Sequence, residues 1–212
     1  MPDRRQFLTM TAAGATVAAG GLLVATSKED AAAVTCLDPI PGTVTAQSGP
    51  VTFVDAMAHK DGAAYQWQYL VLLSDKAGAC AHYRTAQIVQ GERWLLLTLI
   101  GSRDPMDFAT CPNPVTPITF DIPVTSANAI HQDGNLYSCA PHWAPHGSNC
   151  KEQGGGDGTG GTVTYTLVTD TLVEGSYDLQ VGATSFAGSF VAPVCDLTGC
   201  PPRPARTTCV AG

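Results

Sequence analysis

Positive charge is scarce in this chain. Its 212 residues include 11 Lys and Arg against 18 Asp and Glu, which gives a formal net charge of −7 at pH 7. Proteins that bind nucleic acid or anionic lipid surfaces present clustered Lys and Arg, whereas the basic residues of this chain are scattered. The composition therefore argues against a nucleic-acid partner and against an anionic membrane surface.

The common catalytic motifs are also missing. The chain has no G-x-S-x-G, no H-E-x-x-H and no Ser-x-x-Lys with suitable partners. Paired acids for glycoside hydrolysis have no local spacing by which to recognise them, and five acids could serve: Asp121, Asp133, Asp157, Glu174 and Asp178. We interpret the chain as non-catalytic, with no catalytic residue and no cofactor, and keep an unrecognised hydrolase as an alternative.

A glycine-rich run at 153–161 has the composition of a ligand loop but not its motifs. It lacks the Lys-Ser/Thr of a P-loop, and it is not a repeated calcium-binding nonapeptide. Such runs are usually flexible connections. We therefore expect a mobile loop at these positions.

The N-terminus carries the most specific pattern in the chain. Arg4 and Arg5 lie between Asp3 and Leu8, and an uncharged stretch rich in Ala, Gly, Thr and Leu continues to Ser27. A basic head followed by an apolar stretch and small residues is typical of an export signal. The arginine pair resembles twin-arginine (Tat) signals, which direct folded proteins across bacterial membranes. We expect export to the periplasm, the cell envelope or the extracellular space.

The expected signal ends after Ala33, because residues 31–33 are the small residues that precede a cleavage site. This gives a signal peptide at 1–33, a single domain at 34–212 and no stable membrane span after cleavage. Two alternatives remain open. The stretch before Lys28 is long enough to stay as an uncleaved anchor, although it is weakly apolar. Cys36 could carry a lipid, although Thr35 stands where a lipobox requires Gly, Ala or Ser.

All eight cysteines follow the expected signal: Cys36, Cys80, Cys111, Cys139, Cys150, Cys195, Cys200 and Cys209. Thiols oxidise outside the cytoplasm, so an even number of cysteines in an exported chain indicates disulfides. Their spacing does not determine the connectivity. A reduced Cys/His metal site is the alternative.

Residues 131–161 form a Cys/His loop in this interpretation. Two cysteines and two histidines have the spacing C-x2-H-x3-H-x3-C at Cys139, His142, His146 and Cys150. Two sulfurs and two imidazoles would suit zinc or copper, but zinc ligands more often come in pairs from two separate elements. We therefore expect a local Cys139–Cys150 disulfide, with both histidines exposed at the loop tip and no bound metal. A copper or zinc protein using this loop is the alternative.

The rest of the chain consists of short β-type runs separated by Gly, Pro and polar turns. Strands are expected at 43–46, 51–56, 64–74, 94–100 and 118–124, with a proline-rich loop at 102–117. A short helix is expected to begin at an N-cap near Ser74, run towards Gln90 and carry Cys80. Three alternating runs at 162–169, 172–181 and 184–192 are joined by short connections, which predicts an antiparallel meander.

These elements predict a mainly β domain, an antiparallel β-sandwich or open barrel with one short helix, stabilised by disulfides. A Cys/Pro-rich tail is expected at 193–212. The apolar faces of the expected strands predict six largely buried side chains: Trp67, Tyr69, Trp94, Leu96, Tyr177 and Phe190.

The segment from Val173 to Cys195, together with the turn from Asp75 to Cys80, resembles a family of uncharacterised exported bacterial proteins, many described as putative lipoproteins. The resemblance implies a β fold and an exported location, and it implies no activity. We expect an envelope or secreted β domain that acts as a binding or structural module, with an unknown protein or glycan partner.

Overall fold

The computed structural model describes residues 39–103, 110–198, 200 and 207–212. The expected signal at 1–33, with Arg4 and Arg5, lies outside these residues, and so does Cys36. Within the described parts of the chain, no helix combines the length and the apolar character needed to cross a bilayer.

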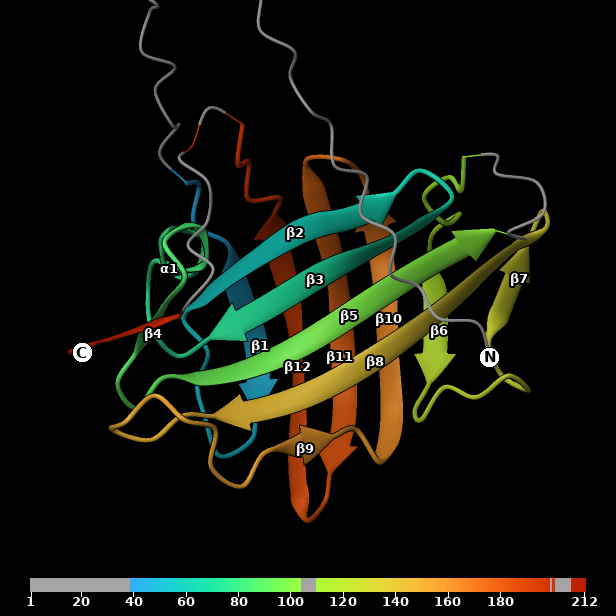
Figure 1. The fold of residues 1–212 in the computed structure, drawn as a ribbon. Coiled ribbons are helices and arrows are strands. Elements are labelled where there is room, and N and C mark those ends of the chain that lie inside the picture. Colours follow the sequence, from blue (N-terminus) through green and yellow to red (C-terminus); the bar gives the residue numbers. More distant parts are fainter. Residues whose placement is uncertain (1–38, 104–109, 199, 201–206) are drawn as a thin grey trace, which may run out of the picture. The chain divides into compact units, whose positions relative to one another are not determined.

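Two antiparallel sheets form a sandwich, which confirms the predicted fold class (Figure 1). One sheet has five strands in the order β1-β12-β11-β10-β6, and the other has six, in the order β2-β3-β5-β8-β7 with β9 beside β8. In Figure 1 the long strands of the six-stranded sheet run crosswise over those of the other sheet. The strands of the five-stranded sheet are β1 Thr43–Ser48, β6 Ile118–Asp121, β10 Gly160–Val168, β11 Leu172–Val181 and β12 Thr184–Pro193.

The six-stranded sheet contains the strongest strand predicted from sequence. Its strands are β2 Asp55–Ala63, β3 Gln66–Ser74, β5 Arg93–Arg103, β7 Ile130–Gln132, β8 Asn135–Pro145 and β9 Gly156–Asp157. β3 lies between β2 and β5, as its run of apolar residues on both faces requires. The second strand was expected at 51–56, but β2 begins at Asp55 and continues to Ala63. A small parallel pair, β4 Gln87–Val89 and β13 Thr208–Val210, joins the described end of the chain to the domain.

The meander is confirmed, with one irregularity. β10, β11 and β12 pair antiparallel in sequence order. Regular alternation from Val163 and Tyr165 would place Leu167 on the same buried face, but the register of β10 shifts between Tyr165 and Leu167. This bulge adds one residue, so Val168 is buried in its place.

The core lies between the sheets and is rich in aromatic side chains. Trp143 from β8 and Phe186 from β12 have ring centroids 4.8 Å apart, and the Tyr165 hydroxyl donates a 3.1 Å hydrogen bond to the Leu97 carbonyl across the sandwich. Of the six expected core residues, four are buried: Trp67, Tyr69, Tyr177 and Phe190.

The prediction was wrong for Trp94 and Leu96, which are only half-buried. Their strand, β5, is apolar on both faces, so the sequence did not show which face points into the sandwich. Leu95, Leu97 and Leu99 take the inner face and are fully buried. Trp94 and Leu96 face outward, where they pack against a second, smaller cluster beside the helix.

The helix is shorter than expected. α1 spans Ala79–Arg84, and its N-cap is Gly78 in a left-handed conformation, with φ 86°. Ser74 is the last residue of β3, and its hydroxyl bonds Glu92 at 2.7 Å instead of capping the helix. The residues after α1 turn into β4, so the helix does not continue towards Gln90. Cys80 lies on the helix as expected and forms a disulfide with Cys195, which follows β12.

The two faces of β5 allow a direct test of the strand phase. Leu97→Ala should lower the free energy of unfolding by about 2–5 kcal/mol, because it leaves a cavity in the closed core. Leu96→Ala, one residue away on the outer face, should cost less than half as much because its side chain is already partly hydrated. Chemical denaturation of both variants measures the difference, and equal losses would contradict the assignment of Leu97 to the inner face.

Candidate functional site

The expected Cys139–Cys150 disulfide is wrong. Cys150 is bonded to Cys209, and Cys139 is a free, buried thiol on β8. The segment from 139 was expected to be a loop, but it continues as an extended strand to Pro145. Six residues of strand span about 20 Å, so β8 carries the chain away from Cys139 before Cys150 is reached.

Cys139 is held in the sandwich core. It lies opposite Leu99 in the β5–β8 pairing, and its sulfur is 3.6 Å from the Tyr165 hydroxyl. Burial raises the pKa of the Cys139 thiol to about 12, against a smaller opposing effect of the Tyr165 hydrogen bond. Such a thiol stays protonated and is a poor nucleophile or metal ligand near neutral pH.

The two histidines are not displayed at a loop tip. His142 lies on β8, and its side chain is 33% exposed. His146 is half-buried, with its ring centroid 4.4 Å from that of Trp94. Cys139 faces the core, and His142 faces outward three residues later, so the four C-x2-H-x3-H-x3-C side chains do not converge. Within the described residues, no group of three or more His, Cys, Asp or Glu could hold a metal ion.

The glycine-rich run is not a free loop, contrary to the expectation. Residues 146–158, which we call the edge strap, run back along the outer edge of β8. Gln153 donates a backbone hydrogen bond to Pro145, and Gly158 donates one to Pro141, while β9 pairs with His142 and Trp143. A Cβ on Gly155 would lie 2.3 Å from the Trp143 carbonyl, so the strap approaches β8 more closely than a larger residue allows.

His142 lies between two carboxylates of the edge strap. Its Nδ1 is 2.8 Å from Asp157 Oδ1, and its Nε2 is 3.2 Å from Glu152 Oε1. Burial alone would lower the pKa of His142, but the hydrogen bonds and charges of Asp157 and Glu152 outweigh it and raise the pKa above its usual value. Only the protonated ring donates at both nitrogens. Protonation therefore lets His142 donate a hydrogen bond to each of the two carboxylates, Asp157 and Glu152.

The five acids considered for a hydrolase are not brought together. Asp121 and Asp178 lie on β6 and β11, separated by β10 through Thr162. Glu174 is also on β11. Asp157 belongs to the edge strap beside the other sheet, and Asp133 lies in the turn between β7 and β8.

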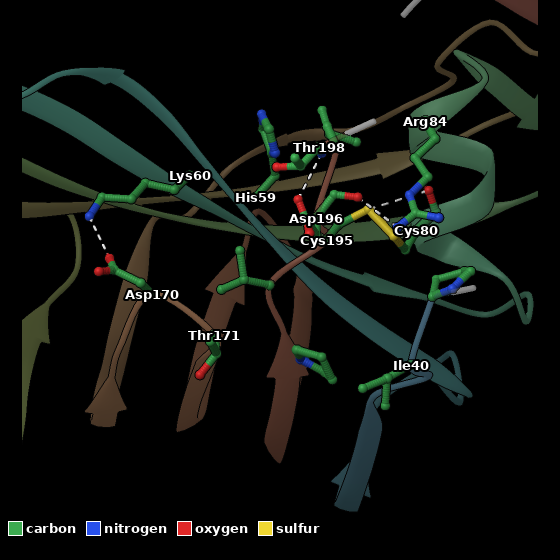
Figure 2. A pocket seen from close by; sticks show the side chains of 14 residues that line it. Ile40, His59, Lys60, Cys80, Arg84, Asp170, Thr171, Cys195, Asp196 and Thr198 are labelled. Atoms are coloured by element: carbon green, nitrogen blue, oxygen red, sulfur yellow. Dashed lines mark hydrogen bonds and ion pairs between the residues drawn. A yellow bond between two sulfur atoms is a disulfide. The ribbon is translucent and has the colours of Figure 1, made fainter. Parts of the chain in front are cut away.

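A cleft of about 660 Å³ lies beside β2 and is seen in close-up in Figure 2. We call it the β2 cleft. It is bounded by β2, α1, the 170–171 turn, the start of the described chain and the segment after β12. Its charged and hydrogen-bonding side chains are His59, Lys60, Arg84, Asp170, Thr171, Asp196 and Thr198, and apolar side chains such as Ile40 and Leu197 complete it.

One end of the cleft carries an ion pair framed by aromatic rings. Lys60 Nζ is 2.8 Å from Asp170 Oδ1 and lies 5.6 and 5.2 Å from the ring centroids of Trp67 and Tyr69. The Tyr69 hydroxyl donates to the same carboxylate at 3.1 Å. Burial opposes the charge on Lys60, but its bond to Asp170 prevails and raises the pKa of Lys60. Hydrogen bonds from Lys60 and Tyr69 lower the pKa of Asp170.

The other end is fixed covalently. The Cys80–Cys195 disulfide joins α1 to the segment after β12, and Figure 2 shows it between Arg84 and Asp196. Arg84 Nη2 donates a 2.6 Å hydrogen bond to the Asp196 carbonyl. The Asp196 carboxylate accepts the Thr198 N–H at 2.7 Å, and this hydrogen bond lowers the pKa of Asp196. These bonds hold α1 and the segment after β12 in one arrangement.

The cleft also contains backbone of a sheet edge. β2 is the edge strand of its sheet. Ala58 forms an isolated parallel bridge with Val194, and the Cys195 N–H donates to the Ala58 carbonyl at 2.7 Å. Backbone groups alternate in direction along a strand, so those of Lys60 point to the same side as those of Ala58. The chain after Cys195 turns towards Arg84 and does not continue the pairing.

Apart from its cysteines, no residue of this cleft stands out in the sequence. Lys60, Arg84, Asp170 and Asp196 come from four distant segments and share no motif. The one usable signal was the pairing of Cys80 with Cys195, which the cysteine count alone does not determine.

The two bonds of His142 should make the edge strap pH-dependent. Because the folded pKa is raised above its ordinary value of about 6.5, the stabilisation is fully present below that value and is lost as the pH rises through the folded pKa. Hydrogen-exchange protection of the Gly158 amide, corrected for intrinsic rates, should therefore fall as the pH rises above about 6.5 and through the raised pKa of His142. His142→Gln should remove this dependence, and an unchanged pH profile in that variant would contradict the assignment.

Comparisons with protein families, curated proteins and solved structures find no match to this chain. Function therefore has to be inferred from the chain's own residues.

Proposed function

We propose that residues 34–212 form an exported, non-catalytic domain that binds an extended segment of a polypeptide partner in the β2 cleft. The observation that carries this proposal is the edge of β2 inside the cleft. There, one parallel segment already pairs at Ala58, and the next outward-facing backbone groups, at Lys60, have no strand beside them in the described chain. Addition of a strand to such an edge is a common mode of peptide recognition.

The shape of the cleft supports this choice. The β2 cleft has a volume of about 660 Å³, which lies within the range of about 300–1,000 Å³ that is usual for small-ligand sites. Main-chain hydrogen bonds to Lys60 would supply affinity, while side chains of the bound segment would contact Ile40 and Leu197 on the apolar lining. The disulfide and the Arg84–Asp196 bond hold the cleft open before binding, which reduces the entropy that binding has to overcome.

Export is the second part of the proposal. Disulfides such as Cys80–Cys195 and Cys150–Cys209 form in oxidising compartments. The Arg4-Arg5 pattern and the resemblance of 173–195 to exported bacterial proteins agree with that location. We propose twin-arginine export, followed by cleavage after Ala33.

Replacing Arg4 and Arg5 together by Lys should leave the precursor in the cytoplasm, because recognition of a twin-arginine signal depends on the arginine pair. The conservative change keeps both charges and therefore separates recognition from charge. Fractionation and immunoblotting of the precursor and mature forms provide the measurement. Unchanged export would show that the chain uses the route for unfolded proteins.

Peptide binding is tested by selecting a displayed library of random ten-residue peptides on the folded, oxidised domain. Lys60→Pro should abolish binding of the selected peptides, because it removes the outward N–H of β2. An edge strand tolerates proline where its N–H does not face the neighbouring strand. Lys60→Met is the matched control: it loses the ion pair with Asp170 but keeps the backbone donor, so strand addition should persist.

The location of the bound peptide is read separately. The Lys60 amide should become protected from hydrogen exchange when a selected peptide binds, and circular dichroism should show that both variants are folded. Equal binding by Lys60→Pro and the parent domain, or protection confined to other strands, would refute strand addition at this edge.

A further inference from the structure

The open part of the β2 edge is closed on one side by the chain itself. At Ala58 the edge is occupied, because Val194 forms a parallel bridge there and the Cys195 N–H donates to the Ala58 carbonyl at 2.7 Å. In a regular parallel ladder the next hydrogen bond would run from the Lys60 N–H to the Cys195 carbonyl. No such bond forms among the described residues. Lys60, which is exposed, is therefore the first open position of this edge.

On its other side, Lys60 is followed by a position that is already partly used. Backbone groups that point away from β3 recur at every second residue of β2, so the next such residue is Gly62. Its N–H donates to the carboxylate of Asp61 at 2.7 Å. An added segment therefore finds both backbone groups of Lys60 and the carbonyl of Gly62.

These groups favour one direction for an added segment. In antiparallel pairing, two residues directly opposite each other can exchange both of their hydrogen bonds. In parallel pairing, the Lys60 N–H would need the carbonyl of the ligand residue that precedes the one opposite Lys60, and Cys195 stands at that position. A parallel segment would leave the Lys60 N–H without a partner. The antiparallel direction therefore makes more hydrogen bonds.

An antiparallel segment runs towards Cys195 and meets it. One ligand residue fits opposite Lys60, but the next two positions along the edge belong to Cys195 and Val194. Cys195 cannot easily move aside, because it is bonded to Cys80 of α1. The ligand chain has room to end opposite Lys60 and none to continue along the edge.

We propose that the β2 cleft binds the free C-terminal end of an extended polypeptide, antiparallel to β2, with its last residue opposite Lys60. This inference rests on the peptide-binding function proposed above and names the part of the partner that is recognised. One oxygen of the terminal carboxylate accepts the Lys60 N–H, and the N–H of the last residue donates to the Lys60 carbonyl. Capture of a C-terminal carboxylate by backbone groups is a recurring mode of peptide recognition.

The charges of the cleft are compatible with a carboxylate. The two acids that line it, Asp170 and Asp196, are balanced by Lys60 and Arg84. Asp170 accepts Lys60 Nζ at 2.8 Å, and Asp196 accepts the Thr198 N–H at 2.7 Å. The lining therefore carries no excess negative charge that would repel the end of a chain.

The first test compares random ten-residue peptides displayed in two formats. In one format the peptide is fused through its N-terminus, so its C-terminus is free, and in the other it is fused through its C-terminus. Selection on the folded, oxidised domain should yield binders only in the format with a free C-terminus. Their binding should be lost in Lys60→Pro and retained in Lys60→Met, which keeps the backbone donor.

Synthetic versions of the selected peptides measure the preference. Two glycines added at the C-terminus should weaken binding by about tenfold or more, because the bonds to Lys60 are lost. The same two glycines at the N-terminus should change the affinity by less than about twofold, since that end points away from Cys195. Amidation of the C-terminus should weaken binding about fivefold, because a hydrogen bond to a charged acceptor is stronger than one to a neutral acceptor.

The direction of the peptide is read separately by NMR. A nitroxide label at the N-terminus of the peptide should broaden the amide signals of Gly62 and Ala63 more strongly than that of Cys195. This measurement needs no substitution in the protein, so it does not depend on the folding of a variant.

The possible failures distinguish this inference from peptide binding itself. Binders in both formats, or equal tolerance of glycines at the two ends, would refute recognition of the chain end and leave strand addition standing. Broadening that is strongest at Cys195 would show parallel binding and overturn the proposed direction. Equal affinity of the amidated peptide would rule out the carboxylate contact. If neither format yields binders that are sensitive to Lys60→Pro, both proposals fail.

Discussion

The buried carboxylate of Asp55 connects elements that bound the β2 cleft. It is 4% exposed and accepts four backbone N–H groups: Gly42 at 3.0 Å, Ala56 at 2.8 Å, Gly78 at 2.8 Å and Ala79 at 2.9 Å. These donors precede β1, lie in β2 and open α1. A carboxylate buried with four donors loses its water but keeps its hydrogen bonds. Replacing it would leave the start of α1 and the entry to β1 without acceptors at the same time.

The sequence predicted those parts of the fold in which one face is apolar and the other polar. β11 and β12 alternate strictly, so their bounds and buried faces could be predicted from Val173 to Ala192. The prediction failed where both faces are apolar, as in β5 around Leu96, because the second apolar face packs beside α1 rather than in the sandwich. It also failed at Leu167, where a bulge changes the phase of β10 without any marking residue.

The candidate sites could not be predicted because their residues meet only through sheet pairing. Cys139 and Cys150 are close in sequence, yet strand geometry separates them, and Cys150 bonds a cysteine 59 residues away. Conversely, Lys60 on β2 and Asp170 in the turn between β10 and β11 are distant in sequence. They meet only because the two sheets pack together. The histidines attracted attention as possible metal ligands, but alternation along β8 directs His142 away from Cys139. Proline was misleading in the same segment, since Pro141 lies inside β8 and the strand continues past it to Pro145.

α1 forms one wall of the β2 cleft, and its position is determined from three sides. Asp55 accepts its first N–H groups, Cys80 bonds it to Cys195, and Arg84 bonds Asp196. Six residues of helix would not be stable alone in water, so these contacts rather than helix propensity hold it in place. Tyr83 of α1 contacts His59 of the β2 cleft, with ring centroids 4.8 Å apart, so a displacement of the helix would also move a side chain that lines the cleft. The Cys80–Cys195 disulfide resists such a displacement.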